Sequence, residues 1–234
     1  MEDKLTIVIP TKNEQKYIGR LLIALYDQNI GQTKIIISDN NSQDNTLSII
    51  QLYSNIFNLN IEVIEGGLPS VARNNGALKA TTPYILFVDA DVTFTRNDAI
   101  ELAMKKLIGK KIVSTTPVYN GTTDLKATLL FSINNHLTKV ISLFDPFAIG
   151  AFTLIRREDF FEKGGYDTEI IQSEDWWLSK QFKSSEFGLV PKLVTQDNRR
   201  FKRFGYMNMI KMMFVNWINR NNPDHFKKNN GYWN

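Results

Sequence analysis

The segment YILFVDADV carries two aspartates, Asp89 and Asp91, directly after an apolar run. On an extended chain, side chains two residues apart point to the same side, so both carboxylates can face one ligand. Hard divalent cations prefer oxygen ligands, and such a cation can hold a diphosphate at the same time. Two solvated aspartates in a turn would give the same letters, but the buried strand predicted before them favours a cation site.

A second pair of carboxylates, Glu174 and Asp175, opens a predicted helix in the segment SEDWWLSKQF. Acidic side chains at the start of a helix can simply complement the helix dipole. A carboxylate held beside a reacting hydroxyl can instead act as a general base. Trp176 and Trp177 follow the pair, and core packing explains them more simply than stacking on the face of a sugar.

The elements around these residues alternate between short apolar strands and amphipathic helices. Strands are predicted at 5–10, 35–38, 61–64 and 84–88, with helices beginning near 18, 46 and 70. This alternation predicts right-handed βαβ units in an open, mostly parallel α/β sheet with helices on both faces. Beyond residue 95 we expect a strand at 112–118, a helix over 125–143 that is interrupted at 134–136, and a helix from 174 to about 184.

Polar residues follow each of the first four predicted strands, at 11–14, 39–41, 65–67 and 89–91. In sheets of this class, ligands bind outside the carboxyl ends of the strands. Four acidic strand ends at one edge of the sheet therefore predict a cation or nucleotide site there. The chain has no cysteine, so a metal would be held by carboxylates, histidine or a ligand's phosphates, which favours Mg²⁺ or Mn²⁺ over Zn²⁺.

Three segments resemble the family 2 glycosyltransferases of the GT-A fold. VIPTKNE matches the family's P-x-x-N-E turn, IISDNNSQDNT its D-[DN]-x-S-x-D-x-T turn, and GGLPSVARNNGALKATTPYILFVDADV its G-x-x-x-A-R-N-x-G stretch before a D-x-D strand. The resemblance implies a Rossmann-like GT-A domain that inverts the anomeric configuration of a sugar taken from a nucleotide diphosphate donor, either UDP- or GDP-linked. It also implies a divalent cofactor, Mn²⁺ or Mg²⁺.

The resemblance also implies which residues bind the donor. Those expected to line the donor site are Pro10, Thr11, Glu14, Asp39, Arg73, Asp89, Ala90 and Asp91. Asp39 would accept a hydrogen bond from the base, and Arg73 would lie near the base or the phosphates. Asp89 would reach the ribose or the metal, and Asp91 would bind the metal directly. Ser42, Asp44 and Thr46 are equally well explained as a helix cap and first turn, so we leave them out of the site.

The segment FFEKGGYDTEIIQSEDWWLSKQF resembles the family's acceptor-side block. It implies that Asp175 takes the proton from the acceptor hydroxyl, with Glu174 as the second choice, while Trp176 and Trp177 are candidates for acceptor binding. Trp177 departs from the acidic or polar residue that the family often has there. The acceptor itself, a saccharide or a lipid-linked molecule with a free hydroxyl or phosphate, stays open.

Two segments near the C-terminus are basic or apolar. In QDNRRFKRFG, the arginines Arg199, Arg200 and Arg203 either clamp the donor diphosphate or form an exposed basic loop. The segment YMNMIKMMFVNWINR is apolar almost all round. We expect residues 204–220 to contact a membrane surface peripherally, or to pack on the core or on a second subunit.

The sequence also predicts the domain boundaries, the cellular location and the charge of the binding partners. We expect one GT-A domain at 1–195, with a donor half at 1–95 and an acceptor half at 96–195, followed by an amphipathic extension at 196–234. No signal peptide and no run of ~18 apolar residues is visible, so we expect a cytoplasmic protein, free or peripherally attached to the cytoplasmic membrane face. The net charge of +4 favours phosphate-rich partners.

Other functional classes fit the sequence less well. A nucleic-acid partner is not expected, because basic residues do not alternate with aromatics on a recognisable module. A nucleotidyltransferase, or a nucleotide-sugar-binding protein without turnover, is the main alternative. The nucleobase, the sugar and the oligomeric state cannot be derived from the residues.

Overall fold

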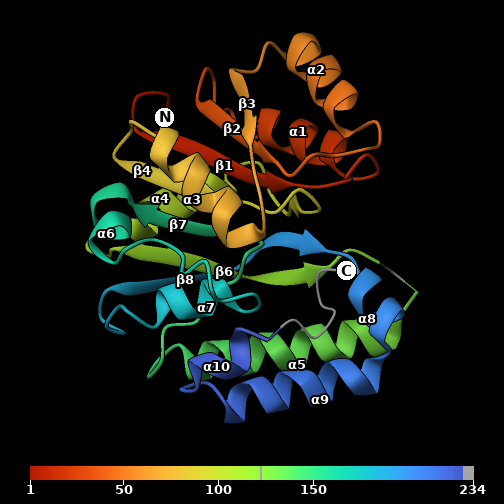
Figure 1. Ribbon diagram of the computed structural model, residues 1–234, viewed down its shortest axis with the longest axis vertical. Coiled ribbons are helices and arrows are strands. Elements are labelled where there is room, and N and C mark those ends of the chain that lie inside the picture. The colour runs from red at the N-terminus through yellow and green to blue at the C-terminus, as the bar shows by residue number, and fades with distance from the viewer. Residues whose placement is uncertain (122, 229–234) are drawn as a thin grey trace.

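A computed structural model describes residues 1–121 and 123–228 of the chain (Figure 1). Eight strands form one sheet in the order β3-β2-β1-β4-β7-β6-β8-β5. The strands are β1 (Leu5–Thr11), β2 (Lys34–Asp39), β3 (Ile61–Glu65), β4 (Tyr84–Phe87), β5 (Thr93–Phe94), β6 (Ile112–Tyr119), β7 (Thr153–Arg156) and β8 (Phe187–Gln196). The strands expected at 5–10, 35–38, 61–64, 84–88 and 112–118 are confirmed.

The first four strands in the order, from β3 to β4, run parallel to one another. Their register aligns Thr11 of β1 with Asp39 of β2, and Asp39 with Glu65 of β3. The interior strands β1 and β2 are almost wholly buried runs of β-branched residues and leucine, as strands covered on both faces must be. The predicted polar strand ends therefore lie at one edge of the sheet.

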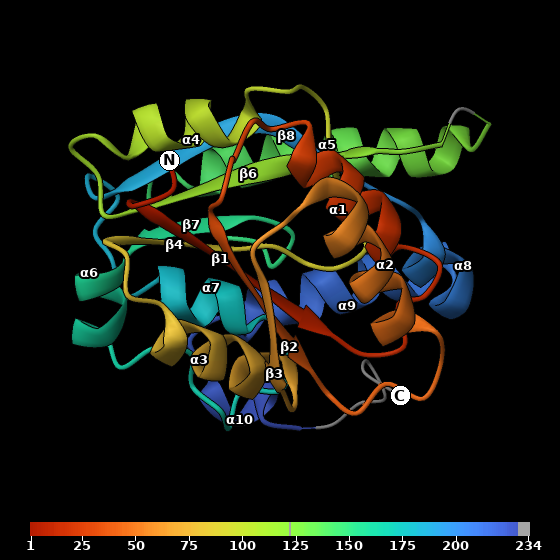
Figure 2. The same ribbon diagram turned by 90° about the horizontal axis from the view of Figure 1, so that it is seen from above.

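Helices cover both faces of the sheet, as the alternating pattern predicts (Figure 2). On one face lie α1 (Ile18–Tyr26), α2 (Thr46–Phe57) and α4 (Ala99–Leu107), whose apolar side chains share a core with β1 and β2. On the other face lie α3 (Pro69–Lys79), α6 (Arg157–Glu162) and α7 (Glu174–Ser179). Helix α3 approaches the sheet closely, because a methyl group on Gly76 would lie 2.3 Å from Cγ1 of Val8.

The second half of the sheet mixes directions. Strand β7 is antiparallel to both β4 and β6, β8 is parallel to β6, and β5 is antiparallel to β8. Helix α5 (Leu125–Ile141) runs without the interruption predicted at 134–136. The prediction was wrong because the polar residue Asn135 is buried and donates from Nδ2 to the carbonyl of Pro117 in β6, at 2.7 Å.

Helix α7 is also shorter than predicted, ending at Ser179 rather than near 184. The Ser179 hydroxyl accepts from the backbone N–H of Ala148 at 3.0 Å and lies 2.9 Å from the carbonyl of Pro146. The chain then turns, so that Phe182 and Phe187 enter the core beneath α3 and α6. Burial of these two rings overrides the helical spacing of the sequence.

Three helices follow β8: α8 (Arg199–Phe204), α9 (Tyr206–Ile218) and α10 (Pro223–Phe226). Gly205, with a φ of 82°, separates α8 from α9. Phe226 of α10 is fully buried against Trp176 and Ile170, which ties the end of the described chain to the start of α7. In residues 1–121 and 123–228, no helix is long and apolar enough to cross a membrane. Positions 229–234 of the predicted extension lie outside the described residues.

Candidate active site

A cavity of about 670 Å³ lies at the carboxyl ends of β1 and β4. Its wall contains residues from the loops that follow these strands, from the start of α3 and from α8. Of the residues predicted from the sequence, it is lined by Pro10, Thr11, Glu14, Arg73, Asp89, Ala90, Asp91, Arg199, Arg200 and Arg203. Segments almost 200 residues apart in the chain thus form one cavity.

Asp39 is absent from the wall of this cavity, although Asn40 beside it is present. Its carboxylate accepts from the backbone N–H and from the hydroxyl of Ser42, at 2.9 and 2.6 Å. The hydroxyl of Ser42 in turn accepts from the N–H of Asn13 at 2.9 Å. Asp39 therefore holds the loop after β2 against the loop after β1.

Asp44 and Thr46 join the same two loops. Asp44 accepts from the N–H of Gln15 at 3.1 Å, and the Thr46 hydroxyl accepts from the N–H of Glu14 at 2.8 Å. The helix-cap interpretation is incomplete, because the N-cap residue of α2 is Asn45 and makes no capping bond with its side chain. One feature of the sequence was consistent with this loop-joining role. Ser42, Asp44 and Thr46 carry short hydroxyl or carboxyl side chains at alternate positions after β2.

Arg73 of α3 is buried among three carboxylates. Its Nη2 donates to Oδ1 of Asp89 at 2.6 Å, and its Nη1 donates to Oε1 of Glu174 at 2.7 Å. Oδ1 of Asp175 lies 3.9 Å from the same Nη1. One guanidinium therefore joins the end of β4 to the start of α7. These carboxylates raise the pKa of Arg73 well above its usual value against the opposing effect of burial.

Asp175 is the member of this group best suited to exchange a proton near neutral pH. Burial raises the pKa of its carboxyl to about 7; the charge of Arg73 opposes this rise and that of Glu174 adds to it. Its Oδ1 is buried and has no hydrogen-bond partner among the described residues. A carboxyl that is only partly ionised at pH 7 is matched to general-base work, whereas Glu174 is paired directly with Arg73.

Gly150, which the sequence did not single out, lets the backbone pass beside these charges. A methyl group at this position would lie 2.6 Å from Nη2 of Arg73, 2.7 Å from Oδ2 of Asp175 and 3.1 Å from Oδ2 of Asp89. Contacts this short do not occur in proteins, so a side chain would push the charged groups apart. In the sequence, this close approach was indicated only by a glycine between Ile149 and Ala151, shortly before β7.

Arg199 of α8 also lines the cavity at the carboxyl ends of β1 and β4, where it connects two further carboxylates. It binds Glu14 with both terminal nitrogens at 3.0 Å, and its Nη2 also lies 2.7 Å from Oδ2 of Asp91. Burial and the neighbouring charge of Asp89 raise the pKa of Asp91, although Arg199 opposes the shift. Asp91 is thus a desolvated carboxylate that a cation stabilises.

The acidic side chains in the wall of this cavity could supply oxygen ligands to a divalent metal. Within residues 1–121 and 123–228, no three histidine, cysteine or acidic side chains converge to make a complete site. Mg²⁺ and Mn²⁺ sites on phosphate substrates are commonly built from one or two carboxylates plus phosphate oxygens. Asp91 and Asp89 fit such a site, in which a diphosphate would supply the remaining ligands. The guanidinium of Arg199 contacts Asp91, which shows that this position favours positive charge.

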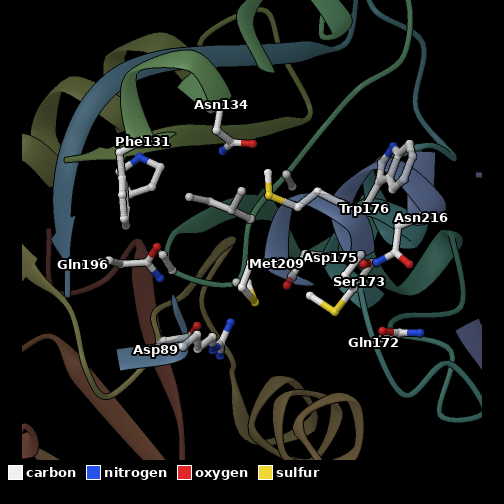
Figure 3. A pocket seen from close by; sticks show the side chains of 18 of the residues that line it. Asp89, Phe131, Asn134, Gln172, Ser173, Asp175, Trp176, Gln196, Met209 and Asn216 are labelled. Atoms are coloured by element: carbon white, nitrogen blue, oxygen red, sulfur yellow. The ribbon is translucent and has the colours of Figure 1, made fainter. Parts of the chain in front are cut away.

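A second cavity, of about 260 Å³, adjoins the first. Figure 3 shows Phe131 and Asn134 of α5 on one side of it, and Met209 and Asn216 of α9 on another. Its wall shares five charged residues with the first cavity: Arg73, Asp89, Asp91, Arg199 and Arg200. It also includes Glu174 and Asp175. The two cavities therefore meet at the carboxylates.

The two predicted tryptophans have different surroundings. Trp176 lines the second cavity while its ring lies 5.0 Å from that of Phe147. Trp177 lines neither cavity, and its ring lies 5.6 Å from that of Phe226. Core packing accounts for Trp177, whereas Trp176 both packs in the core and faces the cavity.

Comparison with known proteins bears on what this arrangement does. The sequence profile described as Glycosyl transferase family 2 matches residues 6–162. The chain belongs to this family. Among curated relatives, the 4,4'-diaponeurosporenoate glycosyltransferase of Staphylococcus aureus strain USA300 is 32% identical over 174 residues, which is 69% of this chain and 46% of the relative. The chain thus spans about half the length of the curated relatives it matches.

The chain has the GT-A fold, which it shares with solved structures of other proteins. A mannosyltransferase from Pyrobaculum calidifontis in complex with GDP-Man and Mn²⁺ superposes with a TM-score of 0.69 at 19% identity, over 92% of this chain and 65% of that one. S. aureus TarS, residues 1–349, in complex with UDP-GlcNAc, gives 0.62 at 20% identity, over 84% and 59%. Structural neighbours of this chain thus bind nucleotide-sugar donors.

The family match ends before several features of the site. It includes the D-x-D pair and Arg73 but stops at residue 162, ahead of α7, α8 and α9. Glu174, Asp175 and Arg199 therefore lie outside the matched segment, although they contact residues within it. The family 2 match thus covers Arg73, Asp89 and Asp91, and the tertiary contacts bring Glu174, Asp175 and Arg199 to them.

Proposed function

We propose that this chain is an inverting, metal-dependent glycosyltransferase that moves a sugar from a UDP- or GDP-sugar to an acceptor hydroxyl or phosphate. The observation that carries the proposal is the meeting of two cavities at one group of charges. A donor in the first cavity and an acceptor in the second would approach each other beside Asp91, Asp89 and Asp175. The family assignment and the donor complexes of the structural neighbours support the same reaction class.

The donor's nucleoside would occupy the part of the first cavity lined by Pro10, Thr11 and Asn40. Asp39 would be the acceptor for the base: its bonds to Ser42 leave lone pairs on both carboxylate oxygens. Its attachment to both loops would fix the width of the pocket. The diphosphate would lie between the aspartates of the D-x-D pair and the arginines of α8, which can bind phosphate oxygens in bidentate fashion.

Asp91, with Asp89 beside it, would hold a divalent cation, Mn²⁺ or Mg²⁺. When bound, that cation would neutralise negative charge on the departing nucleoside diphosphate. Arg199 would exchange its contact with Asp91 for one with the diphosphate, because a cation on Asp91 would repel the guanidinium while the phosphate oxygens attract it. Arg73 would keep Asp89 oriented throughout, since it is buried and hydrogen-bonded on both sides.

Asp175 would accept the proton of the acceptor hydroxyl as its oxygen attacks the anomeric carbon. The bond between that carbon and the diphosphate oxygen would break in the same step, with attack from the opposite side, so the configuration would invert. The raised pKa of Asp175 supports this role, because a base with a pKa near the working pH combines availability with proton affinity. Trp176, on the wall of the second cavity, would contact the acceptor.

Calorimetric titration with UDP, GDP, CDP and dTDP, with and without Mn²⁺, tests the donor site. We expect one diphosphate to bind in a metal-dependent manner and Asp91→Asn to lose the metal dependence. Asp98→Asn is the matched control, because that carboxylate is exposed and pairs with Arg96 away from both cavities. Failure of all four nucleotides to bind would contradict the proposal, and pyrophosphate release from a nucleoside triphosphate would indicate a nucleotidyltransferase.

A further inference from the structure

Helix α5 has an exposed face that is apolar along its whole length. Leucine, isoleucine or valine recurs every three to four residues, at Leu125, Leu129, Ile133, Leu137 and Val140, with exposed fractions between 46 and 80%. The chain continues into Leu143 and Phe144, of which Phe144 is 82% exposed. A helix on the surface of a water-soluble domain normally turns polar residues outward, so this face lacks its expected covering.

Helix α9 repeats the pattern at the same end of the molecule. Met207, Ile210, Phe214, Trp217 and Ile218 are exposed by 39 to 76%, while Met209 faces inward and is buried. Both helices lie at the end of the molecule farthest from α1 and α2 in Figure 1, and Figure 2 shows them separated along the other axis. The second cavity lies between them.

The charges on these segments have one sign. Residues 125–144 contain Lys126 and Lys139 and no acidic residue, and residues 206–220 contain Lys211 and Arg220 and no acidic residue. All 24 acidic residues of the chain fall outside these two segments, so acidic and basic residues occur together only in the rest of the chain. An apolar surface flanked by cations is complementary to an anionic lipid bilayer, whose interior takes the apolar groups and whose headgroups attract the cations.

We propose that the exposed faces of α5 and α9 dock on an anionic membrane surface. A second copy of this chain is a poorer occupant, because two such faces would bring together the four positive charges of each copy, at Lys126, Lys139, Lys211 and Arg220. The wall of the cavity between the helices continues the apolar surface inward through Leu130, Phe131, Met212 and Met213, towards Asp175. Resting on the proposed function, this arrangement assigns the acceptor to molecules with an apolar chain that are held in the bilayer.

Sedimentation of the full chain with lipid vesicles tests the docking surface directly. We expect binding to vesicles of phosphatidylcholine mixed with phosphatidylglycerol, much weaker binding to phosphatidylcholine alone, and a loss of binding as salt screens the charges. Leu129→Glu combined with Phe214→Glu should lower the affinity for the mixed vesicles by tenfold or more. The matched control is Leu52→Glu with Leu78→Glu, which alters equally exposed leucines on α2 and α3.

The outcomes separate this inference from the proposed function. Equal sedimentation of both double variants and the unaltered protein would overturn the docking surface, as would absence of binding to mixed vesicles. Light scattering that shows a dimer, dissolved by the Leu129 and Phe214 substitutions, would assign the face to a second copy instead. Nucleotide titration of the same variants should be unchanged, so a failure of the donor site would appear there and not in sedimentation.

Discussion

Arg199 and Asp91 form an ion pair across the donor cavity, with 2.7 Å between Nη2 and Oδ2. The two residues are far apart in the sequence, since Asp91 follows β4 and Arg199 begins α8. The same guanidinium binds Glu14 in the loop after β1. Helix α8 is thus tied through one side chain to the loops after β1 and β4. Under the proposed function, a donor diphosphate would exchange the contact between Arg199 and Asp91 for its own.

Replacing Arg199 with glutamine should weaken donor binding. A charge-assisted hydrogen bond is worth about 1.5–3 kcal/mol, so we expect the affinity for the nucleoside diphosphate with Mn²⁺ to fall roughly 10- to 100-fold. Calorimetry measures this change. Lys202→Gln serves as the control because Lys202 lies on α8 but lines neither cavity. Equal losses in both variants would mean that α8 contributes only diffuse positive charge.

Transfer by the unaltered protein should depend on pH through Asp175. Burial raises the pKa of this carboxyl to about 7, so below pH 7 it is largely protonated and cannot accept a proton. We expect the transfer rate at saturating donor to rise from acid to neutral pH and to level off above about pH 8. Initial rates over pH 5–9 would reveal the step. A flat profile would remove Asp175 from the role of base.

Asp175→Asn should retain nucleotide binding while transfer falls by roughly 100-fold or more, the scale of a missing general base. Asp167→Asn, on an exposed carboxylate of the preceding loop, is the control. The substitution should also change how stability depends on pH. Since the folded pKa exceeds the ordinary value of 3.8, the contribution of Asp175 to stability is present at low pH and is lost as pH rises through about 7. Unfolding of the asparagine variant should lack this decline.

Removing the charge of Arg73 should destabilise the fold. Arg73→Met would leave Asp89, Glu174 and Asp175 without their shared cation, and uncompensated buried charge costs about 3–5 kcal/mol. Urea unfolding measures the loss, which should be smaller at acid pH than above pH 7, because the raised pKa of Asp175, about 7, lets that carboxyl take up a proton and removes part of the uncompensated charge. Should the methionine variant not fold, Arg73→Lys tests the same point, because one ammonium cannot reproduce the two-sided contact.

Arg157→Met is the matched control for that experiment. Arg157 also hydrogen-bonds across elements, from Nε to the carbonyl of Ala80 at 2.7 Å, but it is only partly buried. We expect this substitution to cost about 1 kcal/mol, as for an ordinary hydrogen bond. A similar cost for both arginines would show that Arg73 is not balanced against its three carboxylates.

Gly150→Ala tests whether the close approach of the backbone sets the geometry of the charges. The added methyl group would lie within 2.7 Å of both Arg73 and Asp175, so we expect about 1–3 kcal/mol of destabilisation and a much larger proportional loss of transfer. Gly19→Ala is the control, because the methyl group would meet the ring of Tyr53, which lines neither cavity, at 3.0 Å. Full transfer by Gly150→Ala would contradict the arrangement described.

The sequence by itself determined the parallel half of the sheet and the gathering of polar strand ends at one edge of it. A buried parallel strand reads as an unbroken apolar run, and the residues after it must meet at one edge whatever else the chain does. The aspartates Asp89 and Asp91 and the polar turns at 11–14 and 39–41 could therefore be predicted to lie near one another. Local pattern was less reliable where burial decided, as Asn135 within α5 and Phe182 beyond α7 demonstrate.

Only the tertiary structure decided which distant residues share the site. Nothing in the spacing of Arg73 and Glu174, 101 residues apart, predicts their contact, nor that Gly150 must lack a side chain beside it. The apolar residues at 206–218 likewise predicted a helix that is either covered by protein or in contact with a membrane. They did not show that α5 also has an exposed apolar face. These relationships depend on how helices cross the sheet in three dimensions, and local propensity and periodicity carry no information about that.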